Sequence, residues 1–307
     1  MKEEDIRPDK ILLENERLYA EDVRQIQKRN NEFKEISCPA CESKDNHFKF
    51  LKHNFNYVEC AKCSTVFINP RPTQKMLAEY YVTSKGIKHY NDKIFPTTEN
   101  ARREQIFTPR AKKVIELCKK FDVTTKVIMD IGAGFGTFVE EVQKLNVFKR
   151  TIAIEPSPDL AATCRKKGIE VIENAVEEVK LNGADVITSF ELIEHLYWPK
   201  DFLLASRKIL SKGGIFIITT PNIKGFDLIT LGESSDSIAG PNHLNHFHPD
   251  SLIYLLECCG FEVLEVLTPG QLDAELVRKK MLAGESNLST CRFLNYILLD
   301  QWESKGE

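Results

Sequence analysis

A glycine-rich segment at residues 130–136, Asp-Ile-Gly-Ala-Gly-Phe-Gly, constrains the fold of this chain more than any other feature. It follows the apolar run 127–129 and precedes a helical pattern whose apolar residues share one face. A strand, a glycine turn and a helix in succession bring backbone N–H groups close to a ligand. A dinucleotide-binding turn would place a glycine at position 137, which is Thr137, and the carboxylate at the strand end suits a ligand with a positively charged amino group better than a pyrophosphate. The segment therefore predicts a cofactor site whose contacts would be Asp130, Gly132, Ala133, Gly134 and Gly136.

Strand and helix patterns alternate regularly from residue 111 onward. Strands are expected at 126–130, 151–155, 169–172, 184–190, 214–220 and 261–267, and helices at 111–120, from 136, at 159–167, at 201–210 and from 249 to 260. Such alternation is typical of an open, mostly parallel sheet covered by helices on both faces. The predicted fold class is α/β, a Rossmann-like doubly wound sheet with a small N-terminal zinc ribbon and flanking helices.

Polar or aromatic residues stand where several of these strands end. Ligands of doubly wound sheets bind beyond the carboxyl ends of the strands, near the switch in strand order. Glu155 ends the second strand and suits the hydroxyls of a ribose, and Asn174 and Ala175 follow the third. Phe190 and Glu191 end the fourth. Each acid alone could equally be a helix cap or a solvated charge, but their order and spacing favour one cofactor pocket.

Two Cys-x-x-Cys pairs near the N-terminus lie 18 residues apart, with two short strand patterns of alternating aromatics between them. Cys38, Cys41, Cys60 and Cys63 can place four thiolates around one structural Zn²⁺. A redox role is the alternative, but a redox motif would be single and would stand at a helix start. The other five cysteines are scattered through helical patterns and are expected to be core residues.

The chain divides into five predicted segments. They are a charged helical segment at 1–34, the zinc ribbon at 35–75, a linker or lid at 76–110, the cofactor-binding α/β core at 111–270 and a helical extension at 271–307. The first segment carries a narrow apolar stripe that would pack on the chain itself or form a dimer contact. Residues 80–110 lack a clear period and would form either a lid or surface helix and loop.

Charge and hydropathy exclude several partners. The ribbon region 36–75 holds six basic and three acidic residues, too few for phosphate-driven binding, so no strong nucleic-acid signal is present. No apolar run approaches the roughly 18 residues of a membrane span, and no signal peptide core begins the sequence. A cytoplasmic location is expected, and the oligomeric state stays open.

From about residue 112 to 267, these motifs resemble the class I S-adenosylmethionine-dependent methyltransferases. Asp130–Gly136 is similar to that family's glycine motif and Glu155 to its acidic second-strand residue, whereas Asn174 stands where Asp is common. The segment Phe190–Leu196 is similar to that of ubiquinone-methylating and small-molecule branches. The cysteine module followed by Phe67–Pro72 and Tyr80-Tyr81 resembles bacterial methyltransferases of sugar and surface-polysaccharide biosynthesis. One departure is that no seventh, antiparallel strand is found after residue 267.

The resemblance also points to a histidine loop at 240–248. His243 matches a recurrent histidine of the related enzymes and is expected to act as a base or to orient the substrate, with His246 as the second candidate. Three histidines in this loop suggest a metal site, but no carboxylate stands in the loop at a natural ligand spacing, and His248 is placed to cap the following helix. His195 is expected in the pocket floor, and Tyr81 and Tyr90 are weaker lid candidates.

The combined expectation is S-adenosylmethionine-dependent methyl transfer to a small hydroxylated acceptor, such as a nucleotide-linked or polysaccharide sugar. Two alternatives remain. One is an RNA-binding or RNA-modifying methyltransferase that grips nucleic acid with the ribbon, and the other is a non-catalytic partner that binds S-adenosylmethionine.

Overall fold

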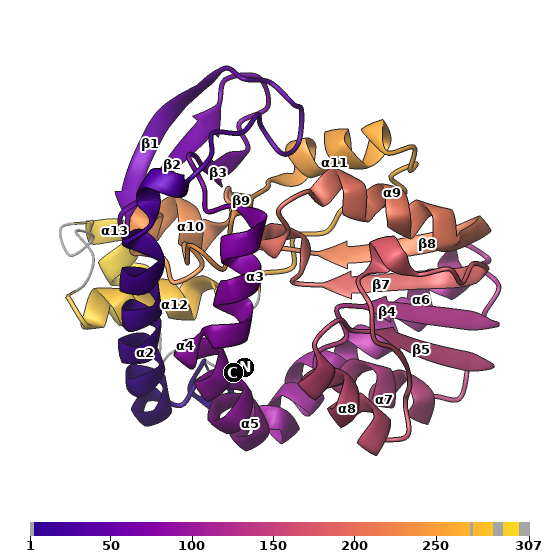
Figure 1. Cartoon of the computed structure of the whole chain (residues 1–307). Helices are drawn as coiled ribbons and strands as arrows, with labels where there is room; N and C mark the ends of the chain where they lie inside the picture. Colours follow the sequence, from indigo (N-terminus) through magenta and orange to yellow (C-terminus); the bar gives the residue numbers. More distant parts are fainter. Residues whose placement is uncertain (1–2, 271–272, 285–290, 301–307) are drawn as a thin grey trace.

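A five-stranded parallel sheet forms the right half of the molecule in Figure 1. The computed structural model describes residues 3–270, 273–284 and 291–300. The sheet has the order β6-β5-β4-β7-β8, and its strands are β4 (Val127–Ile131), β5 (Arg150–Ile154), β6 (Glu170–Ile172), β7 (Ala184–Phe190) and β8 (Leu210–Thr219). The order reverses beside β4, so the switch point lies where the glycine turn begins. The predicted Rossmann-like class is confirmed.

Helices cover both faces of this sheet because the strands are apolar on both sides. One layer contains α6 (Thr108–Lys120), α7 (Thr137–Lys144) and α8 (Pro158–Lys166), and the other contains α9 (Pro199–Ile209) and α11 (Pro249–Cys258). Along β4, Ile128 packs in the first layer and its neighbour Met129 in the second. Alternate residues of a strand point to opposite faces, which explains the near-continuous apolar runs in the sequence.

The N-terminal ribbon is joined to the histidine loop by a second sheet. Its order is β1-β2-β3-β9, from β1 (Asn46–Lys52), β2 (Phe55–Cys60), β3 (Val66–Ile68) and β9 (Asn245–His246). Strand β9 belongs to the histidine loop and pairs antiparallel with β3. Val58 and Phe67 also pack into the same core cluster as the large sheet. The ribbon is therefore part of the folded body rather than an appended module.

The helices of the left half complete the wall facing the sheet (Figure 1). They are α1 (Glu3–Ile6), α2 (Asp9–Gln27), η1 (Asn30–Glu32), α3 (Gln74–Thr83), α4 (Lys85–His89), η2 (Tyr90–Ile94), α5 (Phe95–Arg102) and η3 (Arg103–Phe107). Val23 and Ile26 of α2 are buried in a cluster with the ribbon strands, so the N-terminal segment packs on its own chain. Residues 85–107 are helical throughout and continue without a break into α6, with wide π-helical turns at η2 and η3.

One expectation about the C-terminal part is wrong. Residues 261–270 form no strand, because no hydrogen-bonded ladder joins them to β8, and Leu264, Val266 and Leu267 are exposed. Within the described residues the sheet thus has neither a sixth nor a seventh strand. The remaining elements are η4 (Val176–Glu178), η5 (Ile193–His195), α10 (Phe226–Leu231), η6 (Gly232–Ser234), α12 (Asp273–Leu282), α13 (Arg292–Asn295) and η8 (Tyr296–Asp300). The predicted helical extension at 271–307 lies partly outside the described residues, which end at 300.

No helix in the described part of the chain combines the length and the apolar character that a bilayer crossing requires.

Candidate active site

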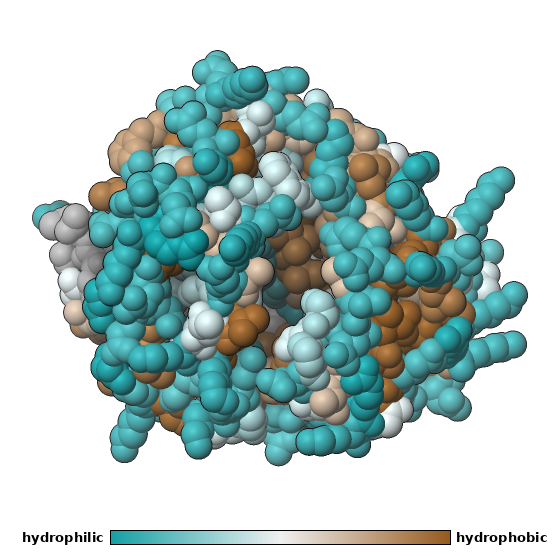
Figure 2. Space-filling model, in the orientation of Figure 1, coloured by the Kyte–Doolittle hydropathy of each residue, from teal (hydrophilic) through white to brown (hydrophobic). Residues whose placement is uncertain are grey.

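A large cavity lies between the two halves of the molecule. Figure 2 shows it as a hollow in the middle of the visible face, and the connected space, about 3880 Å³, extends beyond it along β8 and residues 260–270. The lining residues come from the glycine turn, the ends of β5, β7 and β8, the helices of residues 84–117 and the histidine loop. Most of the predicted cofactor residues, and His243 of the predicted catalytic loop, therefore face one common space.

The glycine turn fits a ligand against its backbone. Gly132, Gly134 and Gly136 have φ of 75°, 56° and 72°, a left-handed conformation that other residues adopt at a cost. A Cβ on Gly136 would lie 2.6 Å from Ile169 Cδ1, so this glycine is needed for packing. A Cβ on Gly134 would meet nothing within 4 Å, although Gly134 and Ala133 line the cavity. The open side of the turn is thus the cavity itself.

Asp130 and Glu155 are both buried beneath the turn and line the cavity. The two Glu155 oxygens accept hydrogen bonds from the Gly134 N–H at 2.8 Å and the Ser157 N–H at 2.9 Å, which fixes the turn. Asp130 accepts the Thr188 hydroxyl hydrogen at 2.6 Å. Burial raises the pKa of Asp130 to about 7 and raises that of Glu155 above its ordinary value. Each carboxylate keeps lone pairs that can accept from a polar or cationic ligand.

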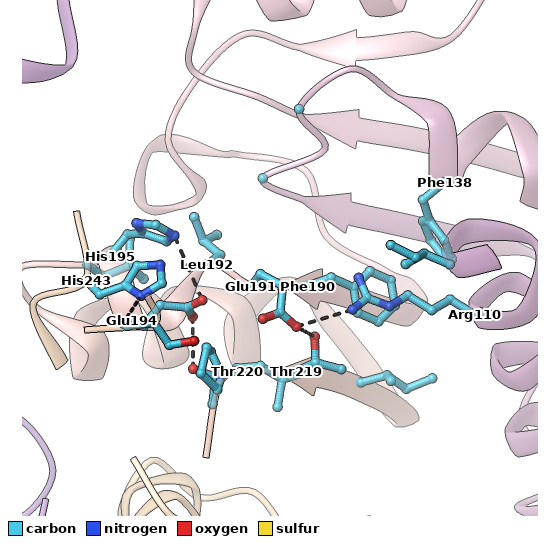
Figure 3. A pocket seen from close by; sticks show the side chains of 18 of the residues that line it. Arg110, Phe138, Phe190, Glu191, Leu192, Glu194, His195, Thr219, Thr220 and His243 are labelled. Atoms are coloured by element: carbon cyan, nitrogen blue, oxygen red, sulfur yellow. Dashed lines mark hydrogen bonds and ion pairs between the residues drawn. The ribbon is translucent and has the colours of Figure 1, made fainter. Parts of the chain in front are cut away.

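The fourth strand end also lies where it was predicted. Phe190 packs edge-on against Phe138 of α7, and the Arg110 guanidinium lies 4.9 Å from the centre of its ring (Figure 3). Glu191 has a left-handed φ of 52°, forms an ion pair with Arg110 at 3.3 Å and accepts the Thr219 hydroxyl hydrogen at 2.6 Å. Two contacts thus hold this exposed side chain at the cavity.

The third strand end does not reach the cavity. Asn174 and Ala175 are exposed and are not among the lining residues. The reason is that β6 has only three residues and forms the outer edge of the sheet, while the buried Val176 anchors the chain that follows. The structure gives no support to their predicted place in the cofactor pocket.

Three polar side chains converge on the other side of the cavity. Figure 3 shows Glu194 and His195 from η5 beside His243 from the loop. His195 Nδ1 lies 2.9 Å from the Asn242 carbonyl oxygen, and His243 Nδ1 lies 2.7 Å from the Ser237 carbonyl oxygen. A carbonyl only accepts, so in each neutral ring Nδ1 carries the hydrogen and Nε2 keeps its lone pair. Desolvation by the surrounding protein lowers the pKa of His243 to about 4 and lowers that of His195.

Glu194 is the member of this group that the sequence analysis missed. Its side chain is 2% exposed, and its Oε2 accepts the Thr220 hydroxyl hydrogen at 2.9 Å. Within the described residues its buried Oε1 has no hydrogen-bond partner and lies 3.9 Å from His195 Nε2. Burial, followed by the charge of Glu191, raises the pKa of Glu194 to about 7. The motif Glu-x-x-Glu-His at 191–195 was the available signal.

His246 and His248 are not part of the group formed by Glu194, His195 and His243. His246 is buried between Tyr57 and His243 and does not line the cavity, so the second catalytic candidate loses its geometrical support. His248 caps α11 through its backbone N–H, which donates to Ser251 Oγ at 3.0 Å, and its Nε2 lies 2.8 Å from the Cys63 carbonyl oxygen. The histidine loop itself contains no carboxylate at a ligand spacing, but Glu194 of η5 supplies one. A group of three potential metal ligands therefore does form here, contrary to the expectation from the loop alone.

The four cysteines of the ribbon form a compact cluster. One ligand atom from each lies within 4.8 Å of the others, and the Cys38–Cys63 and Cys41–Cys60 sulfur atoms are 3.5 and 3.4 Å apart. Four thiolates at a Zn–S distance of about 2.3 Å would be roughly 3.8 Å apart, so this donor set fits a tetrahedral zinc.

A buried guanidinium supports the same reading. Arg71 is fully buried and donates to the Ile68 and Tyr197 carbonyls and to Asn245 Oδ1. Burial lowers the pKa of its guanidinium to about 10, and the neighbouring Tyr197 and Cys38 act in the opposite direction. Within the described residues no carboxylate pairs with it. A zinc bound by four thiolates carries a net negative charge, which would compensate the buried cation. Arg71 was not singled out from the sequence.

A family model and several known proteins match the core of the chain. A family model described as a methyltransferase domain matches residues 102–266. A protein named probable S-adenosylmethionine-dependent methyltransferase from Mycolicibacterium smegmatis is 28% identical over 144 residues, covering 46% of this chain and 53% of the relative. A mitochondrial ubiquinone biosynthesis O-methyltransferase of Candida albicans is 29% identical over 119 residues, covering 34% of this chain and 36% of the relative.

A solved S-adenosylmethionine-dependent methyltransferase from Clostridium acetobutylicum is 18% identical, with a TM-score of 0.40 over 46% of this chain and 61% of that one. The chain spans about half the length of the first curated relatives that it matches. The family model covers the whole five-stranded sheet and more than half of the sequence. The chain therefore belongs to the methyltransferase-domain family.

Proposed function

We propose that this protein transfers a methyl group from S-adenosylmethionine to a small hydroxylated acceptor, of the nucleotide-linked or polysaccharide sugar class. The observation that carries the proposal is the shared cavity, which is lined on one side by Asp130, the glycine turn and Glu155 and on the other by Glu194, His195 and His243. The family membership and the names of the curated relatives support the methyl donor. The resemblance of the cysteine module to sugar methyltransferases supports the acceptor class.

The residues under the glycine turn would hold the donor. The buried carboxylate of Asp130 would attract its cationic amino group, Glu155 would accept from its ribose hydroxyls, and Gly134 would allow its close approach to the backbone. When bound, S-adenosylmethionine supplies a methyl group carried on a positively charged sulfur. The sulfur is the leaving group and keeps the electron pair of the broken carbon–sulfur bond. Phe190, held by Phe138 and Arg110, would supply an apolar wall for the donor.

The residues on the opposite side would hold the acceptor. For a hydroxyl acceptor, the oxygen must be aligned with the methyl carbon and must lose its proton. The Nε2 lone pair of His243 can accept a hydrogen bond from that hydroxyl, so His243 would act as base or orienting residue. His195 contacts His243 edge-on at a ring-centre distance of 4.7 Å and would keep its plane fixed.

The ribbon would contribute a structural Zn²⁺ bound by Cys38, Cys41, Cys60 and Cys63. All four ligands would be protein thiolates, so this ion would have no open position for a substrate. Its role would be to hold β3, and through β3 the histidine loop, in place.

The test joins two measurements on the purified chain. Calorimetry should show one S-adenosylmethionine bound per chain, and a mass-shift screen of nucleotide-linked sugars should show a product heavier by one methyl group. His243→Ala should abolish product formation while the donor still binds. A protein that binds no S-adenosylmethionine with Asp130 and Glu155 intact would contradict the proposal. Methylation of RNA but of no sugar would favour the nucleic-acid alternative.

Donor binding should depend on pH through Asp130. The pKa of this carboxyl is about 7 in the ligand-free protein, so below pH 7 most of it is protonated. It must then lose that proton before it can pair with a cationic ligand. Affinity should fall roughly tenfold from pH 8 to pH 6, as expected for one ionisation centred near 7. Calorimetry at several pH values measures this fall, and Asp130→Asn should remove it while retaining the titration of the ligand itself.

Protein stability should respond to Asp130 with the opposite sign. A carboxyl whose pKa is higher in the folded than in the unfolded chain stabilises the fold at low pH, and this contribution is lost as the pH rises toward 7. For donor binding, an affinity of the wild-type protein for S-adenosylmethionine that does not change between pH 6 and pH 8 would contradict the role assigned to Asp130.

A further inference from the structure

We propose that Glu194, His195 and His243 bind a divalent transition-metal cation that is distinct from the ribbon zinc. One ligand atom from each residue lies within 4.8 Å of the other two. Two imidazoles and one carboxylate form a donor set suited to Zn²⁺, Mn²⁺ or Fe²⁺. An ion with bonds of about 2.1 Å holds neighbouring ligand atoms roughly 3.0–3.4 Å apart, so side-chain shifts under about 1 Å would close the group on it.

The hydrogen bonds around the group leave the ligand atoms available. Each histidine uses Nδ1 on a backbone carbonyl, that of Asn242 or Ser237. Neither Nε2 has a hydrogen-bond partner within the described residues, so each can coordinate. A ring nitrogen held by a carbonyl is the usual outer support of a metal-bound histidine.

In the Glu194 carboxylate, likewise, one oxygen is hydrogen-bonded and the other is available to a cation. Thr220 binds Oε2 of Glu194, while the buried Oε1 has no partner in the described part of the chain and lies on the His195 Nε2 side. A buried oxygen without a partner is costly, and a cation would satisfy it.

The position of the group indicates what the cation would do. All three side chains line the cavity, so the remaining coordination positions would be open to the acceptor. A hydroxyl oxygen bound there would be oriented and more acidic, and its proton would pass to solvent. This reading rests on the proposed function for its substrate, a hydroxylated acceptor with one or two neighbouring oxygens, and it makes His243 an orienting residue that acts through the ion.

Manganese binding without donor or acceptor tests the site. The full chain, first shown to hold one zinc per chain in the ribbon, is titrated with Mn²⁺ while the free ion is followed by electron paramagnetic resonance. We expect one Mn²⁺ per chain at micromolar to submillimolar concentrations. Excess Zn²⁺ should displace it, because Zn²⁺ binds such ligands more tightly.

Variants separate this site from other carboxylates and histidines. Glu194→Gln keeps the size of the side chain and should weaken Mn²⁺ binding at least about tenfold, as should His243→Gln. The controls are Glu262→Gln, a cavity carboxylate outside the group, and His53→Gln, a cavity histidine outside it, and both should bind Mn²⁺ as the wild type does.

Thermal unfolding monitored by circular dichroism confirms that each variant is folded. The absence of a second ion at millimolar Mn²⁺ or Zn²⁺ would overturn the proposal, as would binding unaffected by Glu194→Gln. Because no methyl transfer is measured, failure of the proposed enzymatic function would leave this result interpretable.

Discussion

Replacing Cys60 by serine should reduce methyl transfer at least about a hundredfold while leaving S-adenosylmethionine binding within a few-fold of wild type. Cys60 ends β2, and loss of one of four thiolates would release the metal that stabilises the ribbon. Strand β3 of that ribbon pairs with β9, and His248 contacts the Cys63 carbonyl at 2.8 Å. Displacement of these contacts by about 1 Å is enough to misplace an acceptor group.

The donor side should survive the same change because Asp130 and Glu155 are held by the large sheet and the glycine turn. Cys258→Ser is the matched control, since Cys258 is exposed and lies outside the cluster, and it should retain both zinc and activity. Zinc content, donor affinity by calorimetry and turnover are measured on all three proteins. Full turnover by a zinc-free Cys60→Ser variant would refute the structural role of the ribbon.

The sheet was predictable from the sequence because its strands are apolar, short and separated by helices of regular period. Residues 184–190 were predicted as a strand and form β7 with the same bounds. Residues 261–267 are also mostly apolar, with acidic residues only at 262 and 265, but within the described residues no neighbouring strand pairs with them. Strand propensity thus failed where the outcome depends on a hydrogen-bonded partner.

The helical wall at residues 85–110, which the sequence left open between a lid and surface helix and loop, escaped firm prediction for a local reason. Pro96 and Pro109 lie inside it, and each removes a backbone donor that a helix would normally use. The chain accommodates them beside the π-helical turns η2 and η3, which shift the helical period and hide it from a search for 3.6-residue spacing. Packing of Phe95 on Phe135, with ring centres 3.8 Å apart, ties this wall to the glycine turn.

The candidate site was predictable mainly at the carboxyl ends of the parallel strands. Asp130, Glu155 and Glu191 follow strand ends, so the topology of the sheet places them together. Glu194 and His243 are 49 residues apart and meet because the Leu244 N–H donates to the Glu194 carbonyl at 2.8 Å. The buried Arg71 likewise bonds Asn245, a contact across 174 residues. Such pairings depend on how β9 joins the ribbon, and no local pattern reports that.

Gly134→Ala should reduce S-adenosylmethionine affinity at least about tenfold, equivalent to about 1.4 kcal/mol. Its added methyl group meets no protein atom within 4 Å and would occupy the cavity against the turn. The left-handed φ of 56° adds a cost of about 1–2 kcal/mol to folding, so stability should fall modestly. Calorimetry and thermal unfolding separate the two effects.

Gly168→Ala provides the control for strain alone. Gly168 also has a left-handed φ, 75°, and open space around its Cβ, but it does not line the cavity. It should lose similar stability and bind the donor normally. Equal donor affinities for the Gly134 and Gly168 variants would mean that the donor does not lie against this turn. Gly136→Ala should be the least stable of the three, because its Cβ would lie 2.6 Å from Ile169 and 2.9 Å from Cys164 and would overpack the core by about 1–3 kcal/mol beyond the backbone strain.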